Sequence, residues 1–191
     1  MKEDIIFISA VRNLYKARAG FAELANLKII SGNDNHIGDV GEYYILWYLK
    51  SVGEDVIISG KRNSLYDLEN NSTKEKISVK TITTWSKNGK GAQINTDSPD
   101  WNLLYCLYLG KDLIPDKVAK IDYFEFSEQK VIKENKERRI LTNSKSFPQF
   151  QWWEWLENYR DQDAESKIKE HFRDLLNGKR SKISKKSNIT H

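Results

Sequence analysis

The feature that most constrains the fold is an uninterrupted apolar run, LLYCLYL, from Leu103 to Leu109. A continuous run of this length is typical of a β-strand that is buried on both faces, because a half-buried strand would alternate apolar and polar residues. The run therefore predicts an interior strand of a sheet. Cys106 lies within it and is the only cysteine of the chain, which predicts a small buried side chain and excludes an internal disulfide.

Hydrophobic periodicity elsewhere predicts helices at both ends of the chain, with short strands between them. The predicted helices are Glu3–Lys28, Ile37–Val52, Trp152–Tyr159 and Ala164–Leu176, and the predicted strands are Asp55–Ser59, Leu65–Glu69, Lys76–Thr83, Leu103–Leu109 and Lys117–Phe126. This order predicts an α/β or α+β fold with a central mixed β-sheet flanked by helices. We expect one domain over residues 1–178, with a core at 37–126, a helical C-terminal part at 150–178 and a basic tail at 179–191.

Composition indicates the cellular location of the protein more than its activity. No apolar run is long enough to span a bilayer, and the N-terminal segment MKEDIIFISAVRN lacks the pattern of a secretion signal, so we expect a cytoplasmic protein with no membrane association. The net charge of +4 is too small to indicate nucleic-acid binding by itself. The last thirteen residues carry five Lys or Arg and no acid, which is compatible with phosphate contacts and equally with a solvated terminus.

Residues suited to catalysis gather in a predicted hairpin from Tyr66 to Thr81, YDLENNSTKEKISVKT. Ser78 and Lys80 point to the same face of its second strand, and ordinary register brings Asp67 of the first strand close to them. A carboxylate and a main-chain carbonyl from this edge suit Mg²⁺, which takes few protein ligands and keeps several waters. Such a pairing suits cleavage of a phosphodiester by water. Lys80 would then position the attacking water, help to deprotonate it, or offset the charge that develops on the phosphate. An ordinary solvent-facing strand would show the same residues.

The helix before these strands adds a second carboxylate. Glu42 lies in the segment GDVGEYYILWYLK, at the edge of its apolar face, and this helix is expected to pack on the strands that follow. Gly38 and Gly41 have no Cβ, so the first turn of this helix permits close approach of a backbone or a ligand. Glu42 is either a second ligand of the same metal or a solvated side chain, whereas Asp39 is better suited to the helix N-terminus.

In this ordered combination, residues 37 to 110 resemble the PD-(D/E)XK nuclease superfamily, the restriction-endonuclease-like fold. Its members have a helix bearing a Glu, three strands that carry an Asp and a (Glu/Asp)-x-Lys motif, then a helix and a further strand. The resemblance implies catalytic roles for Glu42, Asp67, Ser78 and Lys80. It also implies a Mg²⁺ site formed by Asp67, Glu42 and the main-chain carbonyl of Val79.

The sequence departs from the superfamily's pattern at two positions. Tyr66 stands where a proline precedes the Asp, which is a frequent variation, and Ser78 stands where a second acidic ligand is expected. Some members have a serine there and recover the missing charge from a nearby acid. Glu42 is the natural replacement and Glu69 a less favoured one. If neither carboxylate reaches the site, the resemblance implies a catalytically inactive member of the fold.

Polar residues around the hairpin are of the types that read base edges or contact phosphates, although a surface loop would have the same composition. The predicted DNA contacts are Lys61, Arg62, Lys87, Asn88, Lys90, Gln93 and Asn95. The aromatic segment QWWEWLENY predicts a helix that docks into the core or into a subunit interface, with base stacking as the less favoured alternative. A homodimer would suit an enzyme that cuts both strands of a symmetric site.

The sequence therefore predicts a Mg²⁺-dependent endonuclease acting on double-stranded DNA, with a small type II restriction enzyme as the favoured member of that class. The alternatives are a structure-specific resolvase or repair nuclease, a catalytically inactive DNA-binding protein on the same fold, and an unrelated enzyme. The chain has no GK[ST] phosphate loop, which disfavours an NTPase, and its three histidines lack the spacing of zinc ligands.

Overall fold

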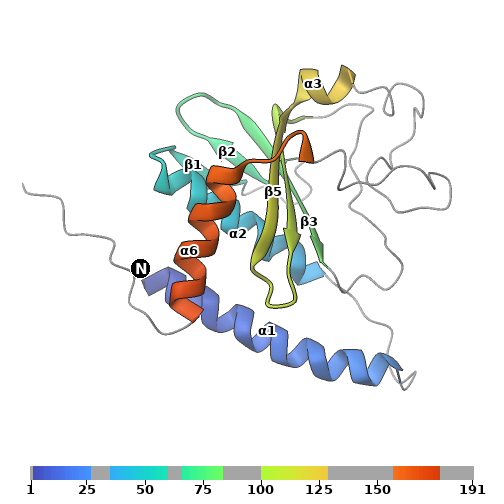
Figure 1. The fold of residues 1–191 in the computed structure, drawn as a ribbon. Helices are drawn as coiled ribbons and strands as arrows, with labels where there is room; N and C mark the ends of the chain where they lie inside the picture. The colour runs from blue at the N-terminus through green and yellow to red at the C-terminus, as the bar shows by residue number, and fades with distance from the viewer. Residues whose placement is uncertain (1, 27–34, 60–65, 84–99, 129–156, 177–191) are drawn as a thin grey trace, which may run out of the picture.

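The computed structural model describes residues 2–26, 35–59, 66–83, 100–128 and 157–176 (Figure 1). The helices of this part of the chain are α1 (Lys2–Asn26), α2 (Asn35–Ser51), α3 (Tyr123–Glu128) and α6 (Gln162–Leu176), and the strands are β1 (Val56–Ile58), β2 (Leu68–Asn70), β3 (Lys76–Thr83), β4 (Leu103–Leu109) and β5 (Pro115–Asp122). No helix in these ranges is both long enough and apolar enough to cross a membrane.

Within these residues the strands form one five-stranded sheet in the order β1-β2-β3-β4-β5. β1, β2 and β3 are antiparallel neighbours, β3 pairs with β4 in parallel, and β4 pairs with β5 antiparallel. The predicted mixed sheet flanked by helices is confirmed. The order of a helix, three strands and a later strand agrees with the order that the resemblance implied, and residues 84–99, between β3 and β4, lie outside the described ranges.

β1, β2 and β5 differ in their bounds from the sequence-based prediction, and two of these differences affect the interpretation. β2 begins at Leu68, so Asp67 directly precedes the strand instead of lying on it. The chain after Asp122 is helical, because the Asp122 carboxylate accepts the backbone N–H of Glu125 at 2.8 Å and so caps the first turn of α3. The predicted strand over Lys117–Phe126 therefore ends four residues early.

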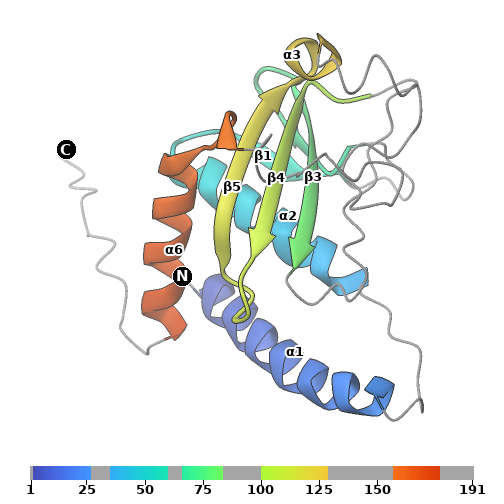
Figure 2. The same cartoon turned by 45° about the vertical axis from the view of Figure 1, so that its right-hand side comes forward.

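The sheet is buried on both faces at β4, as the apolar run predicted. α2 and α6 pack on one face, against β3 and β5 respectively, and Figure 2 shows both helices beside the strands. This face buries Ile77, Val79, Tyr105, Leu107 and Val118. The opposite face buries Trp101, Leu104, Cys106, Ala119, Ile121 and Phe126, which confirms the buried position predicted for the cysteine.

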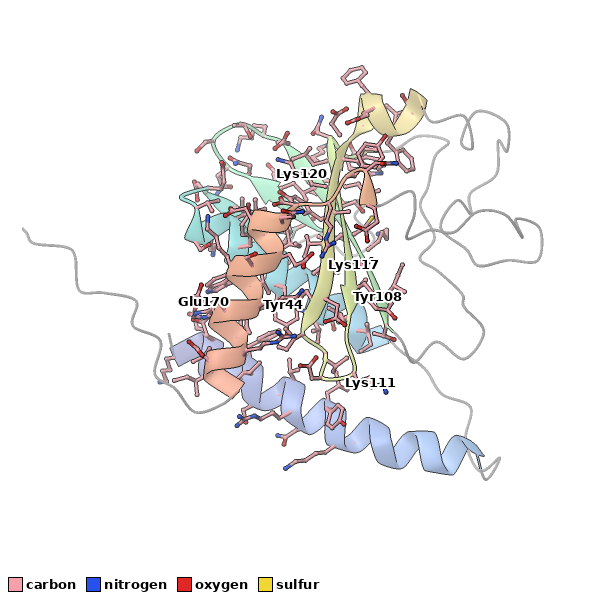
Figure 3. All side chains as sticks on the ribbon, in the orientation of Figure 1. Tyr44, Tyr108, Lys111, Lys117, Lys120 and Glu170 are labelled. Carbon is pink, nitrogen blue, oxygen red and sulfur yellow. The ribbon has the colours of Figure 1, made fainter. Side chains whose placement is uncertain are left out.

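α1 crosses below the ends of the strands (Figure 2) and is attached to the other helices through Asp4. The buried carboxylate of Asp4 accepts a hydrogen bond from the hydroxyl of Tyr43 on α2 at 3.2 Å, and it lies 3.2 Å from Nε2 of His171 on α6. Tyr44, labelled in Figure 3, donates to the carbonyl of Leu113 between β4 and β5 at 3.0 Å. These buried polar contacts fix α2 between α1, α6 and the sheet.

Candidate active site

The candidate site begins where β2 separates from β3. The two strands pair at Leu68–Ile77 and Glu69–Lys76, and the N–H of Asp67 still donates to the carbonyl of Ile77 at 2.9 Å. The next N–H available on that side of β3 belongs to Val79, and Oδ2 of Asp67 accepts it at 2.6 Å. The Asp67 side chain thus replaces the strand carbonyl that would otherwise continue the ladder.

The second hydrogen bond that the Asp67 carboxylate accepts comes from Ser78. Its Oγ donates to Oδ2 of Asp67 at 3.2 Å, and the side chain is buried, with 2% of its surface exposed. Ser78 therefore holds the neighbouring carboxylate in place. Both hydrogen bonds use Oδ2, and within the described residues Oδ1 accepts none.

Lys80 lies at the same strand end and faces both candidate oxygen ligands. Its Nζ donates to the main-chain carbonyl of Val79 at 3.2 Å and lies 3.6 Å from Oδ2 of Asp67. The side chains of Lys80 and Asp67 are 26% and 22% exposed, so both remain accessible to a ligand. The positive charge of Lys80 thus lies beside the Val79 carbonyl and the Asp67 carboxylate, the two groups predicted to bind a metal.

Glu42 approaches this point from α2, on the helix side of the sheet. Its carboxyl group is partly buried and has no hydrogen bond or ion pair within the described residues. The pKa of Glu42 is raised to about 7, chiefly by burial and then by the negative charges of Asp67 and Asp39, while the positive charge of Lys80 lowers it. Glu42 is therefore within electrostatic range of both Asp67 and Lys80.

Gly41, the residue before Glu42 on α2, lies very close to the sheet. Gly41 packs against Thr81 of β3 so tightly that a Cβ at position 41 would lie 1.9 Å from Thr81 Oγ1. This confirms the expected close approach at Gly41 and identifies Thr81 as a residue that sequence reasoning missed. The signal was present in the alternation of β3, which places Thr81 on the helix-facing side together with Ile77 and Val79.

Glu42 also opens onto a cavity of about 540 Å³ between α1, α2 and Ile58. One wall is apolar and comes from α1, where Phe7, Val11 and Leu14 contribute. Asp39 and Glu42 form an acidic side of the same cavity. The cavity gives solvent a route to the Glu42 carboxyl group.

The remaining predicted acid does not join the site. Glu69 accepts a hydrogen bond from the hydroxyl of Tyr66 at 3.0 Å and lies 3.9 Å from Nζ of Lys74. Its carboxylate is thus engaged at the turn end of the hairpin. Between Glu42 and Glu69, the geometry favours Glu42 as the source of a second negative charge.

The donor atoms at this point fit Mg²⁺. In the described part of the chain, no three His, Cys, Asp or Glu side chains gather where they could hold a metal. Two carboxylates and a main-chain carbonyl are nevertheless an adequate set for Mg²⁺, because this ion completes its octahedron with water. The Lys80 ammonium shows that a cation is favourable beside Val79 O and Asp67 Oδ2.

The predicted DNA contacts lie outside the described residues. Lys61 and Arg62 belong to the range 60–65, and Lys87, Asn88, Lys90, Gln93 and Asn95 belong to the range 84–99. The tryptophan-rich segment up to residue 156 and the basic tail from residue 179 are also outside.

No protein-family model and no curated protein sequence matches this chain. Among solved structures it is similar to a bacterial homing endonuclease, I-Ssp6803I, with a TM-score of 0.38 and 16% sequence identity. The similarity covers 73% of this chain and 96% of the other. A likeness at this identity and TM-score says nothing about the role of any residue in this chain.

Proposed function

We propose that this protein is a Mg²⁺-dependent endonuclease that hydrolyses phosphodiester bonds of double-stranded DNA. A type II restriction enzyme is the member of this class that we favour, in line with the superfamily resemblance. The observation that supports the proposal is the approach of Lys80 on β3 to within 3.6 Å of Asp67, with Glu42 of α2 in electrostatic range of both. Two carboxylates beside a lysine suit metal-assisted attack of water on a phosphate.

Each protein group has a distinct part in this chemistry. Mg²⁺ held by Asp67, Glu42 and the Val79 carbonyl would supply charge neutralisation at the phosphate and a more acidic water. The hydrogen bonds from Ser78 and Val79 orient the Asp67 carboxylate and leave Oδ1 for the metal. The Lys80 ammonium can turn from Val79 O to a phosphate oxygen or to the attacking water, and so stabilise the charge that develops.

Double-stranded DNA and a homodimer are part of the same proposal. Lys, Asn and Gln side chains predicted to contact DNA flank the hairpin in the sequence, and such side chains read base edges and bind phosphates. Two copies of one site, related by a two-fold axis, would cut both strands of a symmetric sequence.

The decisive experiment is incubation of plasmid DNA with the full chain and Mg²⁺. We expect discrete fragments that disappear with a chelator and with Lys80→Ala. Glu42→Gln should also abolish cleavage while retaining the unfolding midpoint. Glu69→Gln is the matched control, because Glu69 is engaged with Tyr66 and Lys74 at the turn end of the hairpin, and it should cleave like the wild type.

The opposite results assign other functions. DNA binding without cleavage in any divalent metal would overturn the enzyme and favour an inactive DNA-binding protein, a candidate supported by Ser78 in place of a carboxylate. Cleavage of branched junctions alone would indicate a resolvase. Loss of activity in Glu69→Gln with full activity in Glu42→Gln would exchange the roles of the two acids.

A further inference from the structure

We infer that the contact between Gly41 of α2 and Thr81 of β3 positions the Glu42 carboxylate for metal binding. Both are positioning residues, since they act through Glu42 and touch neither metal nor substrate. The inference rests on the proposed function and adds to it the element that determines how far α2 lies from the site.

The space at Gly41 leaves no room for a side chain. A Cβ there would lie 1.9 Å from Oγ1, 3.0 Å from Cβ and 3.1 Å from Cγ2 of Thr81. All three distances are shorter than ordinary van der Waals contact, so a larger residue requires the Thr81 side chain or α2 itself to shift, and we infer that α2 moves away from the strand. Gly38, one turn earlier, differs sharply, because its nearest neighbour would be Oε1 of Glu42 at 4.0 Å.

The hydroxyl of Thr81 is the second observation. Its Oγ1 is buried and has no hydrogen-bond partner within the described residues. A buried hydroxyl without a partner costs free energy, about 1–3 kcal/mol, so folding stability does not account for it. An oxygen atom is smaller than the methyl group that valine would place there, and threonine therefore allows α2 to approach more closely.

The chain continuity between Gly41 and Glu42 transmits this contact to the site. Glu42 is the next residue of the same helix, and its carboxyl group is held in electrostatic reach of Asp67 and Lys80. Mg²⁺ requires short oxygen bonds in nearly ideal octahedral geometry, so it tolerates little displacement of a ligand. An outward shift of α2 would separate the two carboxylates that share the ion.

The test measures Mn²⁺ affinity by electron paramagnetic resonance, together with the unfolding midpoint in chelator and DNA cleavage. We expect Gly41→Ala to weaken Mn²⁺ binding by about 10-fold to 100-fold, the range found when groups that orient a metal ligand are lost. Gly38→Ala is the matched control on the same helix and should bind Mn²⁺ like the wild type. Thr81→Val provides a smaller outward displacement, and should weaken binding in the same direction even if Gly41→Ala does not fold.

Two double variants distinguish positioning from general destabilisation. Thr81→Ala added to Gly41→Ala should recover part of the Mn²⁺ affinity, since the nearest atom then becomes Cβ at 3.0 Å. Gly41→Ala added to Glu42→Gln should weaken binding no further, because Glu42→Gln has already removed the ligand that Gly41→Ala displaces. The inference would be overturned if Gly41→Ala and Thr81→Val both bound Mn²⁺ with wild-type affinity. It would also be overturned if the first double variant recovered no affinity, or if the losses in the second were additive. A wild-type chain that binds no Mn²⁺ would instead defeat the proposed function itself.

Discussion

The carboxylate of Asp67 accepts the backbone N–H of Val79 at 2.6 Å, across the point where β2 leaves β3. One side chain thus has two functions, because it ends the strand ladder and offers its other oxygen to a ligand. The first function belongs to folding and the second to the proposed chemistry, so substitutions can separate them.

Asp67→Asn and Asp67→Ala are expected to differ in stability but not in activity. Asparagine retains an acceptor for Val79 N–H, whereas alanine leaves that donor without a partner, at a cost of about 1–3 kcal/mol. Both remove the negative charge and should abolish cleavage and Mn²⁺ binding. Urea unfolding and plasmid cleavage measure the two effects, and equal stability of the two variants would show that the hydrogen bond contributes little.

Lys80→Met should weaken catalysis without weakening metal binding. The ammonium now lies 3.2 Å from Val79 O and 3.6 Å from Asp67 Oδ2, so its removal frees the carbonyl, takes away a competing positive charge and should leave Mn²⁺ affinity unchanged or increased. Cleavage should fall by about 10²-fold or more, the usual loss for a group that stabilises transition-state charge. Calorimetric titration with Mn²⁺ and single-turnover cleavage test this, and a parallel loss of both would assign Lys80 a structural role.

Asn70 should be the main polar determinant of hairpin stability. Its buried side chain accepts the N–H groups of Ser72 and Thr73 at 2.9 and 3.1 Å and donates to Glu54 at 2.8 Å. Asn70→Ala leaves these groups unpaired and should lower the free energy of unfolding by about 1–3 kcal/mol. Asn71→Ala is the adjacent control, because the Asn71 side chain makes one exposed hydrogen bond of 3.3 Å to Asp55 and its loss should change stability little. Similar losses in both variants would contradict this assignment.

Acid should destabilise the helical layer through His171. Burial lowers the pKa of His171 from its ordinary value of 6.5, and this effect outweighs the attraction of Asp4 and Asp174. The folded chain therefore favours the neutral imidazole, so this contribution to stability is complete above pH 6.5 and is lost as the pH falls below it. Unfolding free energies measured between pH 7 and pH 5 should decrease more in the wild type than in His171→Gln. Parallel pH profiles would show that His171 titrates alike in both states.

Much of the fold could be predicted because its determinants are local in the sequence. The apolar run of β4 predicted burial on both faces, and the alternation along Lys76–Thr83 placed Ser78 and Lys80 on the side opposite Val79. The capping of α3 by Asp122 was missed, because the apolar pattern of β5 continues into that helix. The predicted DNA contacts stay predictions, since they fall outside the described residues.

The sequence by itself determined which residues could take part in catalysis and on which element each one lies, because side-chain direction follows from the period of a helix or strand. Only the tertiary structure decided that Ser78 supports Asp67, that Glu69 is engaged elsewhere and that Glu42 lies within electrostatic range of Asp67 and Lys80. These outcomes depend on where β2 separates from β3 and on how closely α2 approaches Thr81. Such distances arise from packing between segments far apart in the chain, which no local pattern specifies.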